Sequence, residues 1–310
     1  MSFLVFLCAV LKNAIYGLSV FFVGALTDNV DVLDVLALRY IISFAALTLL
    51  RAFKVIKIRV RFKDFFDKKS GVSDLLLAGL FEPCLYMFFE TMGISMTTGI
   101  TAGVIISLSP VVNCFTEAWV LKVKAGALKI SFLIVGIIGA LYIAIKGGSA
   151  GGEDKPLGIL FMFLAIIVGA FFSSFSSKSS KKFSSIEITY ITVAMGLILF
   201  NGVNVVRHLI AGSIGSYFAP YFNPENIKGF IFLGIISTCL ATFMNNYALS
   251  KITPTTMAAF GGISTLVTVL GGVFLSGENI YYYHYIGFAL ILFRMISVSV
   301  LDIHKSRKRA

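Results

Sequence analysis

Six ionisable side chains lie inside apolar runs that are long enough to cross a lipid bilayer. Three of them are positive and three negative, namely Lys12, Arg39, Glu82, Glu90, Glu117 and Arg294. A charged side chain at the centre of a membrane helix costs about 2.5 to 3.5 kcal/mol on insertion scales, so these groups need partners or a watery cavity. They predict a polar transport pathway. The alternative is structural ion pairing or snorkelling, which is strongest for Glu117 beside a basic loop.

The segment around Glu82 has the most informative spacing. Glu82, Tyr86 and Glu90 follow one another at intervals of one helical turn, in a segment otherwise rich in Leu, Met and Phe. Side chains at this spacing share one face of a helix, so we expect the stripe to face a cavity. Pro83 removes a backbone hydrogen bond, and we expect it to kink the helix next to Glu82.

Other polar side chains are expected at similar depths. Lys12, Asn13 and Tyr16 form a polar turn of the first helix, and Arg39 is expected beside Glu90 or on the same charged group of a substrate. Equal distance from the same membrane surface suggests that Arg294 holds Glu82 or an anionic group of the substrate. The predicted substrate-binding residues are Lys12, Asn13, Tyr16, Arg39, Glu82, Tyr86, Glu90, Asn245, Asn246 and Arg294.

The elements that must position these residues are membrane helices. The chain has 310 residues, of which 58% are hydrophobic and 13% charged, with a mean hydropathy of +0.93. A membrane helix takes about 20 apolar residues. We therefore predict an all-α polytopic membrane protein with ten transmembrane helices, near 3–25, 33–51, 74–94, 98–120, 129–146, 157–177, 186–210, 228–249, 254–276 and 282–301.

The basic residues indicate the orientation. Most Lys and Arg residues fall in alternate loops, above all between Arg51 and Lys69, and in the tail. Because cytoplasmic loops carry the excess of basic residues, we expect a multi-pass protein of the plasma (inner) membrane with both termini in the cytoplasm. The net charge of +11 is thereby explained, and no nucleic-acid partner is predicted.

Two halves meet at a Gly-rich connector at 147–156. We expect one five-helix repeat over 1–146, a second over 157–301 and a basic tail over 302–310. Five is an odd number, so the second repeat enters the membrane inverted, an arrangement typical of secondary transporters with a central site. A shift of 155 positions aligns Cys84 with Cys239, Phe88 with Phe243, Ser95 with Ser250, Thr98 with Thr253, Ser109 with Ser264, and Val112 with Val267.

Motifs of other function classes are absent from the sequence. There is no GxxxxGK[ST] phosphate loop and no HExxH motif, and the four cysteines have no paired spacing. No cofactor, metal site or catalytic residue is therefore predicted. Stripes of small residues, such as Gly103 and Ser107 in one half and Gly261 and Thr265 in the other, are explained by close helix packing. Room for a substrate is the alternative.

Several stretches resemble a known family. They are the run from Asn246 to Phe260, its continuation from Ser264 to Glu278, the parallel run from Gly93 to Pro110, Leu38-Arg39-Tyr40, and Ile286 to Ile291. Together they resemble the EamA-like branch of the drug/metabolite transporter superfamily. The resemblance implies a carrier with a cavity between two halves, usually an exporter of small metabolites. In this comparison Arg294 stands where the repeat would have a glycine.

We therefore expect a secondary transporter that moves a small polar or amphipathic metabolite, such as an amino acid, by alternating access. Its partners would be this metabolite and the lipid bilayer, and assembly into a homodimer stays open. The alternative function is a membrane channel or scaffold without active transport. A membrane enzyme is a third and more distant hypothesis.

Overall fold

The computed structural model describes residues 2–60, 71–97, 99–123, 126–147, 155–276 and 281–307. Within these ranges the chain forms helices and no strand. Some predictions lie outside the described residues: those for the basic residues of 61–70, Thr98, connector residues 148–154, Glu278 and the last three residues of the tail.

The first half of the chain supplies nine helical elements over the described residues. They are α1 (Phe3–Thr27), α2 (Val32–Ala52), α3 (Val72–Gly79), η2 (Leu80–Leu85), α4 (Tyr86–Ile94), α5 (Gly99–Ser107), α6 (Ser109–Thr116), η3 (Glu117–Leu121) and α7 (Ala127–Gly147). The second half supplies α8 (Pro156–Ser179), α9 (Ser185–Ile210), η4 (Ile214–Ser216), α10 (Ala219–Phe222), α11 (Pro224–Ile231), η5 (Phe232–Ala241), α12 (Thr242–Leu249), α13 (Pro254–Ala259), α14 (Gly262–Ser276) and α15 (Tyr282–Arg307).

Seven helical segments of the described chain are long and apolar enough to cross a membrane. They are Phe3–Thr27, Val32–Ala52, Val72–Ile94, Thr101–Leu121, Pro156–Ser179, Ser185–Ile210 and Pro224–Leu249. Each coincides with a predicted span. The predicted spans near 129–146, 254–276 and 282–301 coincide with α7, with α13 and α14, and with α15, which do not meet the same criteria over the described residues.

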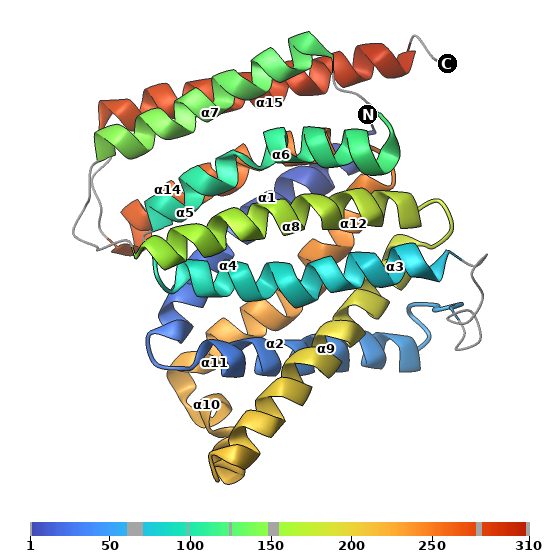
Figure 1. Ribbon diagram of the computed structural model, residues 1–310, viewed down its shortest axis with the longest axis vertical. Coiled ribbons are helices and arrows are strands. Elements are labelled where there is room, and N and C mark those ends of the chain that lie inside the picture. Colours follow the sequence, from blue (N-terminus) through green and yellow to red (C-terminus); the bar gives the residue numbers. More distant parts are fainter. Residues whose placement is uncertain are drawn as a thin grey trace.

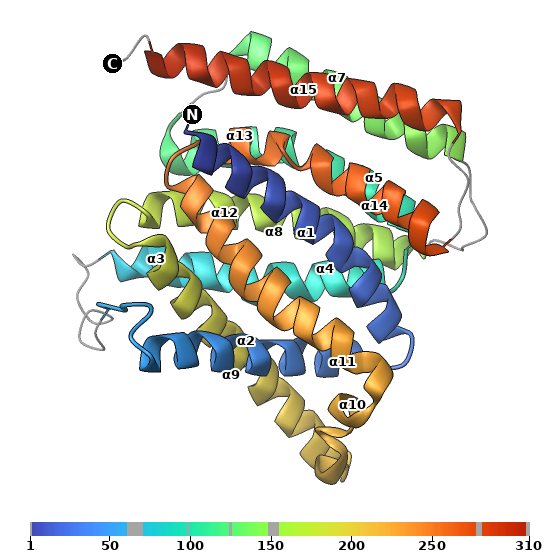
Figure 2. The same ribbon diagram turned by 180° about the vertical axis from the view of Figure 1, so that it is seen from behind.

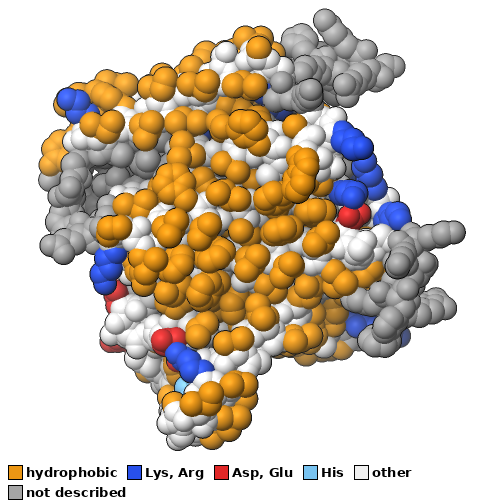
Figure 3. Space-filling view, in the orientation of Figure 1, with side chains coloured by type: hydrophobic (Ala, Val, Ile, Leu, Met, Phe, Trp, Pro, Cys, Tyr) orange, Lys and Arg blue, Asp and Glu red, His pale blue; other side chains and the backbone are white. Residues whose placement is uncertain are grey.

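Many helices, among them α2, α8, α7 and α15, run in similar directions in layers, while α1, α9 and the segment of α11 and α12 cross them obliquely (Figures 1 and 2). At one edge α7 and α15 lie side by side, and at the opposite edge α2 packs against α9. Between these edges lie α1, α8, and the segments that contain α4 to α6 and α12 to α14 (Figure 2). The beginning of α1 and the end of α15 lie at the same end of the bundle (Figure 1). Hydrophobic side chains cover the middle of the face in Figure 3, while charged groups gather near the two ends, as expected of a chain in a bilayer.

Three membrane segments contain a break. Glu82 has φ −136° and ψ 122°, which is not helical, and it precedes Pro83 inside the third segment. The predicted kink is thereby confirmed. A second break separates α5 from α6 at Leu108, and a third separates α13 from α14 at Phe260 and Gly261. All three breaks border the cavity described below.

Glu117 has a structural partner. Its side chain is 4% exposed, and its Oε2 accepts a hydrogen bond of 2.9 Å from the backbone N–H of Thr255. Thr255 lies in the first turn of α13, where backbone N–H groups lack intrahelical acceptors and a negative charge is favourable. Glu117 thus caps a helix of the other half of the chain, which favours the structural interpretation of this charge.

The small-residue stripes bring helices close together. The hydroxyl of Thr265 on α14 donates to the carbonyl of Gly103 on α5 at 3.5 Å, and that of Thr268 donates to the carbonyl of Gly17 on α1 at 3.1 Å. A Cβ atom on Gly17 would lie 2.6 Å from the carbonyl oxygen of Ser264. Close packing of backbones therefore accounts for these contacts, whereas Gly261 of the second stripe lines the cavity described below.

A polar cluster joins α2 to α9 at the end of the bundle away from the two termini (Figure 3). The carboxylate of Asp34 accepts hydrogen bonds from Asn204 and His208 and pairs with Arg207, each at 2.8 Å. Arg207 also pairs with the exposed Asp31 at 2.5 Å. Next to the cluster, burial raises the pKa of Tyr217, whose hydroxyl donates to Asn201 at 2.6 Å. The cluster fixes the ends of two helices that the core packs together.

Candidate functional site

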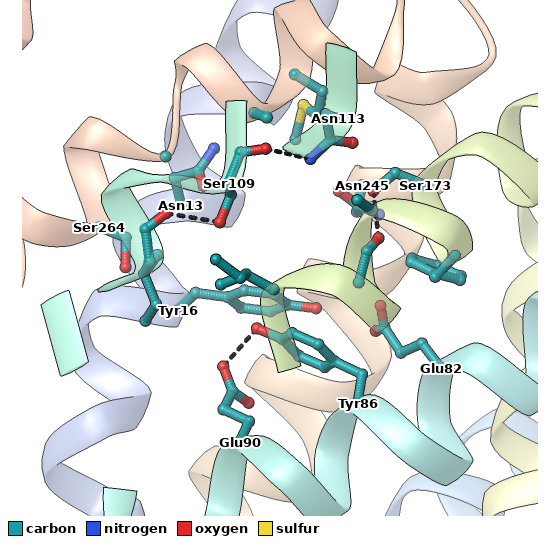
Figure 4. Close-up of a pocket in the computed structure, with 18 of the residues that line it drawn as sticks. Asn13, Tyr16, Glu82, Tyr86, Glu90, Ser109, Asn113, Ser173, Asn245 and Ser264 are labelled. Atoms are coloured by element: carbon teal, nitrogen blue, oxygen red, sulfur yellow. Dashed lines mark hydrogen bonds between the residues drawn. The ribbon is translucent and has the colours of Figure 1, made fainter. Parts of the chain in front are cut away.

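A cavity of about 100 Å³ lies where segments of both halves converge. Its wall combines apolar side chains with charged, amide and hydroxyl groups (Figure 4). The polar residues of the wall are Lys12, Asn13, Tyr16, Glu82, Tyr86, Glu90, Ser109, Asn113, Ser173, Asn245 and Ser264. They come from α1, η2, α4, α6, α8, α12 and α14, so residues from 12 to 264 meet at one site.

One wall is a polar turn of α1. The ammonium of Lys12 lies 4.2 Å from the centroid of the Tyr16 ring, a distance at which a cation is attracted to the face of an aromatic ring. Asn13 is buried and donates from its amide to the carbonyl of Ala9 at 2.8 Å. Within the described chain Lys12 forms no salt bridge.

The kinked segment forms a second wall. Glu82 is 6% exposed and points into the cavity from the break (Figure 4). One and two turns further on, the hydroxyl of Tyr86 donates to Oε1 of Glu90 at 2.5 Å. The Tyr86 ring packs on Gly169 of α8, where a Cβ atom would lie only 2.9 Å from the ring. The predicted stripe therefore lies on one face, and the absence of a side chain at residue 169 makes room for it.

The charges of this site act on one another without direct pairing. Lys12 and Arg39 both exert attractive electrostatic forces on Glu82 and on Glu90. No salt bridge of 4.0 Å or less joins any two of these four residues. Electrostatic interactions are stronger away from bulk water. The cavity thus presents separated charges of both signs to whatever enters it.

The opposite wall consists of amides and hydroxyl groups that the sequence analysis did not identify as site residues. Asn113 of α6 donates to the carbonyl of Ser109 at 2.9 Å, and its buried Oδ1 has no hydrogen-bond partner in the described structure. Ser173 of α8, next to Asn245, and Ser264 of α14, on the side of Asn13 and Tyr16, also line the cavity (Figure 4). A signal for two of them existed, because the shift of 155 residues pairs Ser109 with Ser264.

Seven of the ten predicted site residues line the cavity: Lys12, Asn13, Tyr16, Glu82, Tyr86, Glu90 and Asn245. Asn246 does not. It is 0% exposed, accepts a hydrogen bond of 2.7 Å from Ser176 of α8 and donates one of 3.0 Å to Thr189 of α9. Successive residues of a helix differ by about 100° in direction, so Asn245 and Asn246 face different neighbours.

Arg39 lies behind the wall of the cavity. It is 2% exposed, and its guanidinium donates from Nε and one terminal nitrogen to the hydroxyl of Thr238 at 3.0 and 2.8 Å. No ion pair with Glu90 forms, although the charge of Arg39 acts on that residue. Shared binding of a substrate by Arg39 and Glu90 stays a prediction.

The proposed pairing of Arg294 with Glu82 is wrong in this structure. Arg294 donates to the backbone carbonyls of Ser107 and Ala259, at 3.3 and 3.4 Å, and does not line the cavity. The two side chains have different neighbours, because Glu82 lines the cavity and Arg294 lies against Gly136 and Gly262. An anionic group of the solute as a partner of Arg294 stays a prediction.

With this geometry in view, comparison with known proteins decides the family. The EamA-like transporter family matches residues 3–145 and again residues 156–300. The chain belongs to the EamA-like transporter family. This family is part of the drug/metabolite transporter superfamily, and its two matches divide the chain into two repeats on either side of residues 146–155.

Relatives of this EamA-like protein carry consistent descriptions. An uncharacterized transporter of Bacillus subtilis (strain 168), YcxC, is 30% identical over 304 residues, which cover 98% of this chain and 95% of the relative. An uncharacterized transporter of Archaeoglobus fulgidus is 25% identical over 229 residues, or 71% of this chain and 74% of the relative. A crystal structure with a TM-score of 0.68 and 16% identity covers 96% of both chains and shows the same fold. The protein is therefore a multi-pass membrane transporter.

Proposed function

We propose that this EamA-like protein is a secondary transporter that moves a small polar or amphipathic metabolite, such as an amino acid, through the cavity by alternating access. One observation carries the proposal. Lys12 on one side, and Glu82 and Glu90 on the other, face a shared cavity within the apolar bundle without pairing directly with one another. Opposite charges held apart in this way suit a solute that itself carries both charges.

The chemistry of the wall supports a zwitterion. An ammonium group of the solute would approach Glu82, Glu90 and the unpartnered Oδ1 of Asn113, while its carboxylate would approach Lys12. Such charge-assisted hydrogen bonds are about twice as strong as neutral ones. A volume of about 100 Å³ is smaller than the roughly 300 to 1,000 Å³ of pockets for drug-sized ligands, which favours a small solute.

The breaks in the helices support movement around this site. Discontinuous helices at the meeting of two repeats are a feature of secondary transporters in which the repeats rock around a central site. We place two inverted five-helix repeats at 1–146 and 157–301, joined by the connector at 147–156. The distribution of basic residues supports a plasma (inner) membrane protein with both termini in the cytoplasm, and the family resemblance favours export.

The proposal is tested with purified protein, first by thermal shift against amino acids, amines, sugars and nucleosides, and then by counterflow in liposomes. A ligand that binds the folded state raises the unfolding temperature. We expect an amino acid to stabilise the protein and to show saturable counterflow. Glu90→Gln should lower the apparent affinity for that amino acid at least tenfold in both assays. Glu225→Gln is the matched control, because Glu225 is exposed in the first turn of α11. Non-saturating flux would indicate a channel, and absence of flux a scaffold; either result contradicts the proposal.

Orientation is tested separately with an impermeant thiol reagent on intact cells. Ser216 and Lys181 are exposed near opposite ends of α9. A cysteine at residue 216 should react and one at residue 181 should not, relative to the parent chain. Reversed labelling would refute the proposed orientation.

A further inference from the structure

Arg294 on α15 is a buried cation to which the proposed transport site assigns no role. Its side chain is 0% exposed. Its two terminal nitrogens donate to the backbone carbonyls of Ser107 at 3.3 Å and Ala259 at 3.4 Å, and its Nε has no hydrogen-bond partner in the described structure. No carboxylate of the described chain forms a salt bridge with it. Its counterparts are thus backbone carbonyls alone.

The two acceptors occupy equivalent places in two helices. Ser107 is the last residue of α5, directly before the break at Leu108, and Ala259 is the last residue of α13, directly before the break at Phe260 and Gly261. The carbonyls at the C-terminal end of a helix run short of intrahelical donors and carry the negative end of its dipole. One guanidinium therefore joins the ends of two half-helices, one from each repeat.

The same two breaks form part of the cavity wall. Ser109 and Asn113 follow the break after α5, and Gly261 and Ser264 lie at and after the break that follows α13; all four line the cavity. Arg294 does not line it and reaches the breaks from α15, which pairs with α7 at the edge of the bundle (Figures 1 and 2). The Arg294 side chain thus contacts the two breaks on the side that faces away from the cavity.

Two glycines make room for the guanidinium. A Cβ atom on Gly136 of α7 would lie 2.2 Å from Cδ of Arg294, and one on Gly262 of α14 would lie 2.8 Å from its terminal nitrogen. Both distances are shorter than real Cβ contacts, so a larger residue at either position would require the arginine side chain to shift. The long side chain, the two glycines and the two carbonyls fit together as one arrangement.

We propose that Arg294 is a positioning residue that ties the break between α5 and α6 to the break between α13 and α14. The two broken helices then bend as a pair when the cavity opens to one side or the other. The tie itself is a property of the fold; its use in transport rests on the proposed function. Lysine could not replace Arg294 fully, because its ammonium group lacks the planar, rigid set of donors with which a guanidinium binds two acceptors at once.

The tie is tested by hydrogen exchange of the full-length protein in lipid nanodiscs, without any solute. In Arg294→Met, we expect amide exchange in peptides covering both breaks to speed up about tenfold, which corresponds to about 1.4 kcal/mol, while peptides of α2 and α9 keep their rates. Arg39→Met is the matched control, because it removes an equally buried arginine that bonds a side chain and not these breaks. It should leave both breaks unchanged.

Unchanged exchange at the breaks in Arg294→Met would overturn the proposal, and so would equal acceleration throughout the protein. If the methionine variant does not fold, Arg294→Lys is used, because it keeps the buried charge. It should speed up amide exchange at one or both breaks. Exchange rates equal to those of the parent protein at both breaks would refute the proposed contact of one guanidinium with two carbonyls. In liposomes, Arg294→Lys should slow counterflow several-fold while ligand-induced thermal stabilisation persists. If the unmodified protein shows no counterflow in liposomes, the proposed function is refuted. The hydrogen-exchange result for Arg294 is not affected by that outcome.

Discussion

Asp34 offers the sharpest test of how charge and burial combine in this fold. Asp34 belongs to α2, and its partners belong to α9. Its carboxylate accepts hydrogen bonds from Asn204 and His208 and pairs with Arg207, each at 2.8 Å. Its neighbour Asp31 also pairs with Arg207, at 2.5 Å. The two aspartates differ mainly in exposure, which is 13% for the side chain of Asp34 and 52% for that of Asp31. Substitution of each aspartate by asparagine therefore separates the effect of losing a charged partner from the effect of burial.

The expected magnitudes follow from these contacts. A hydrogen bond to a charged group contributes about 1.5 to 3 kcal/mol, and asparagine offers one oxygen where Asp34 has two. Its amide hydrogens would then face a donor of Arg207 or His208. We expect Asp34→Asn to lower the free energy of unfolding by about 2 to 4 kcal/mol. Asp31→Asn should lower it by less than about 1 kcal/mol, since exposed ion pairs contribute little and asparagine remains a good N-cap.

The free energies are measured by titrating the purified protein with a denaturing detergent and following its unfolding by circular dichroism. The double variant Asp34→Asn with His208→Gln should cost less than the sum of the two single changes, because both remove one contact. Equal losses for Asp31→Asn and Asp34→Asn, or additive losses in the double variant, would refute the reasoning. Added salt should reduce the loss of unfolding free energy caused by Asp31→Asn at a lower concentration than the loss caused by Asp34→Asn.

Further predictions concern the packing behind the cavity. Gly169→Ala should destabilise the protein by about 1 to 3 kcal/mol, because the new methyl group would meet the Tyr86 ring; Gly202→Ala, with nothing within 4 Å, should be neutral or stabilising. Unfolding midpoints distinguish them, and equal shifts would contradict this explanation. Asn246→Ala should cost about 1 to 3 kcal/mol, since it removes the acceptor of the buried Ser176 hydroxyl and one of the two partners of the Thr189 hydroxyl, yet spare solute binding. Asn245→Ala should show the reverse pattern in the thermal-shift assay, and identical behaviour of the two variants would argue against their different placement.

The helices were predictable because their cause is local. A run of about 20 apolar residues suffices to predict a membrane helix, and the predicted segments near 33–51 and 186–210 match α2 and α9 within a residue at each end. The kink at Glu82 was equally local, since Pro83 supplies it. What a single segment dictates by itself can be inferred without knowledge of its neighbours.

The positions that were missed depend on direction around the helix axis. Arg294 and Glu82 were expected at similar depths from their positions along the sequence, but depth does not tell which neighbour a side chain faces, and Arg294 lies against Gly136 and Gly262. Asn245 and Asn246 could have been separated, because adjacent residues on a helix do not share a face. Ser173 had no signal in the sequence: it donates to the carbonyl of Gly169 at 3.0 Å, as serines do elsewhere in membrane helices.

The cap that Glu117 provides for α13 bears on how a duplicated chain evolves. A carboxylate from the first repeat meets the amide of Thr255 in the second, so a half produced alone would contain either a buried charge or a helix end without its partner. Two copies of one half could not replace the natural pair, because the segment equivalent to each partner has a different sequence. Co-expressed fragments divided within 148–154 should find each other in the membrane, whereas either fragment alone should be degraded. The contact thus makes each half depend on the other for the partner of a buried group.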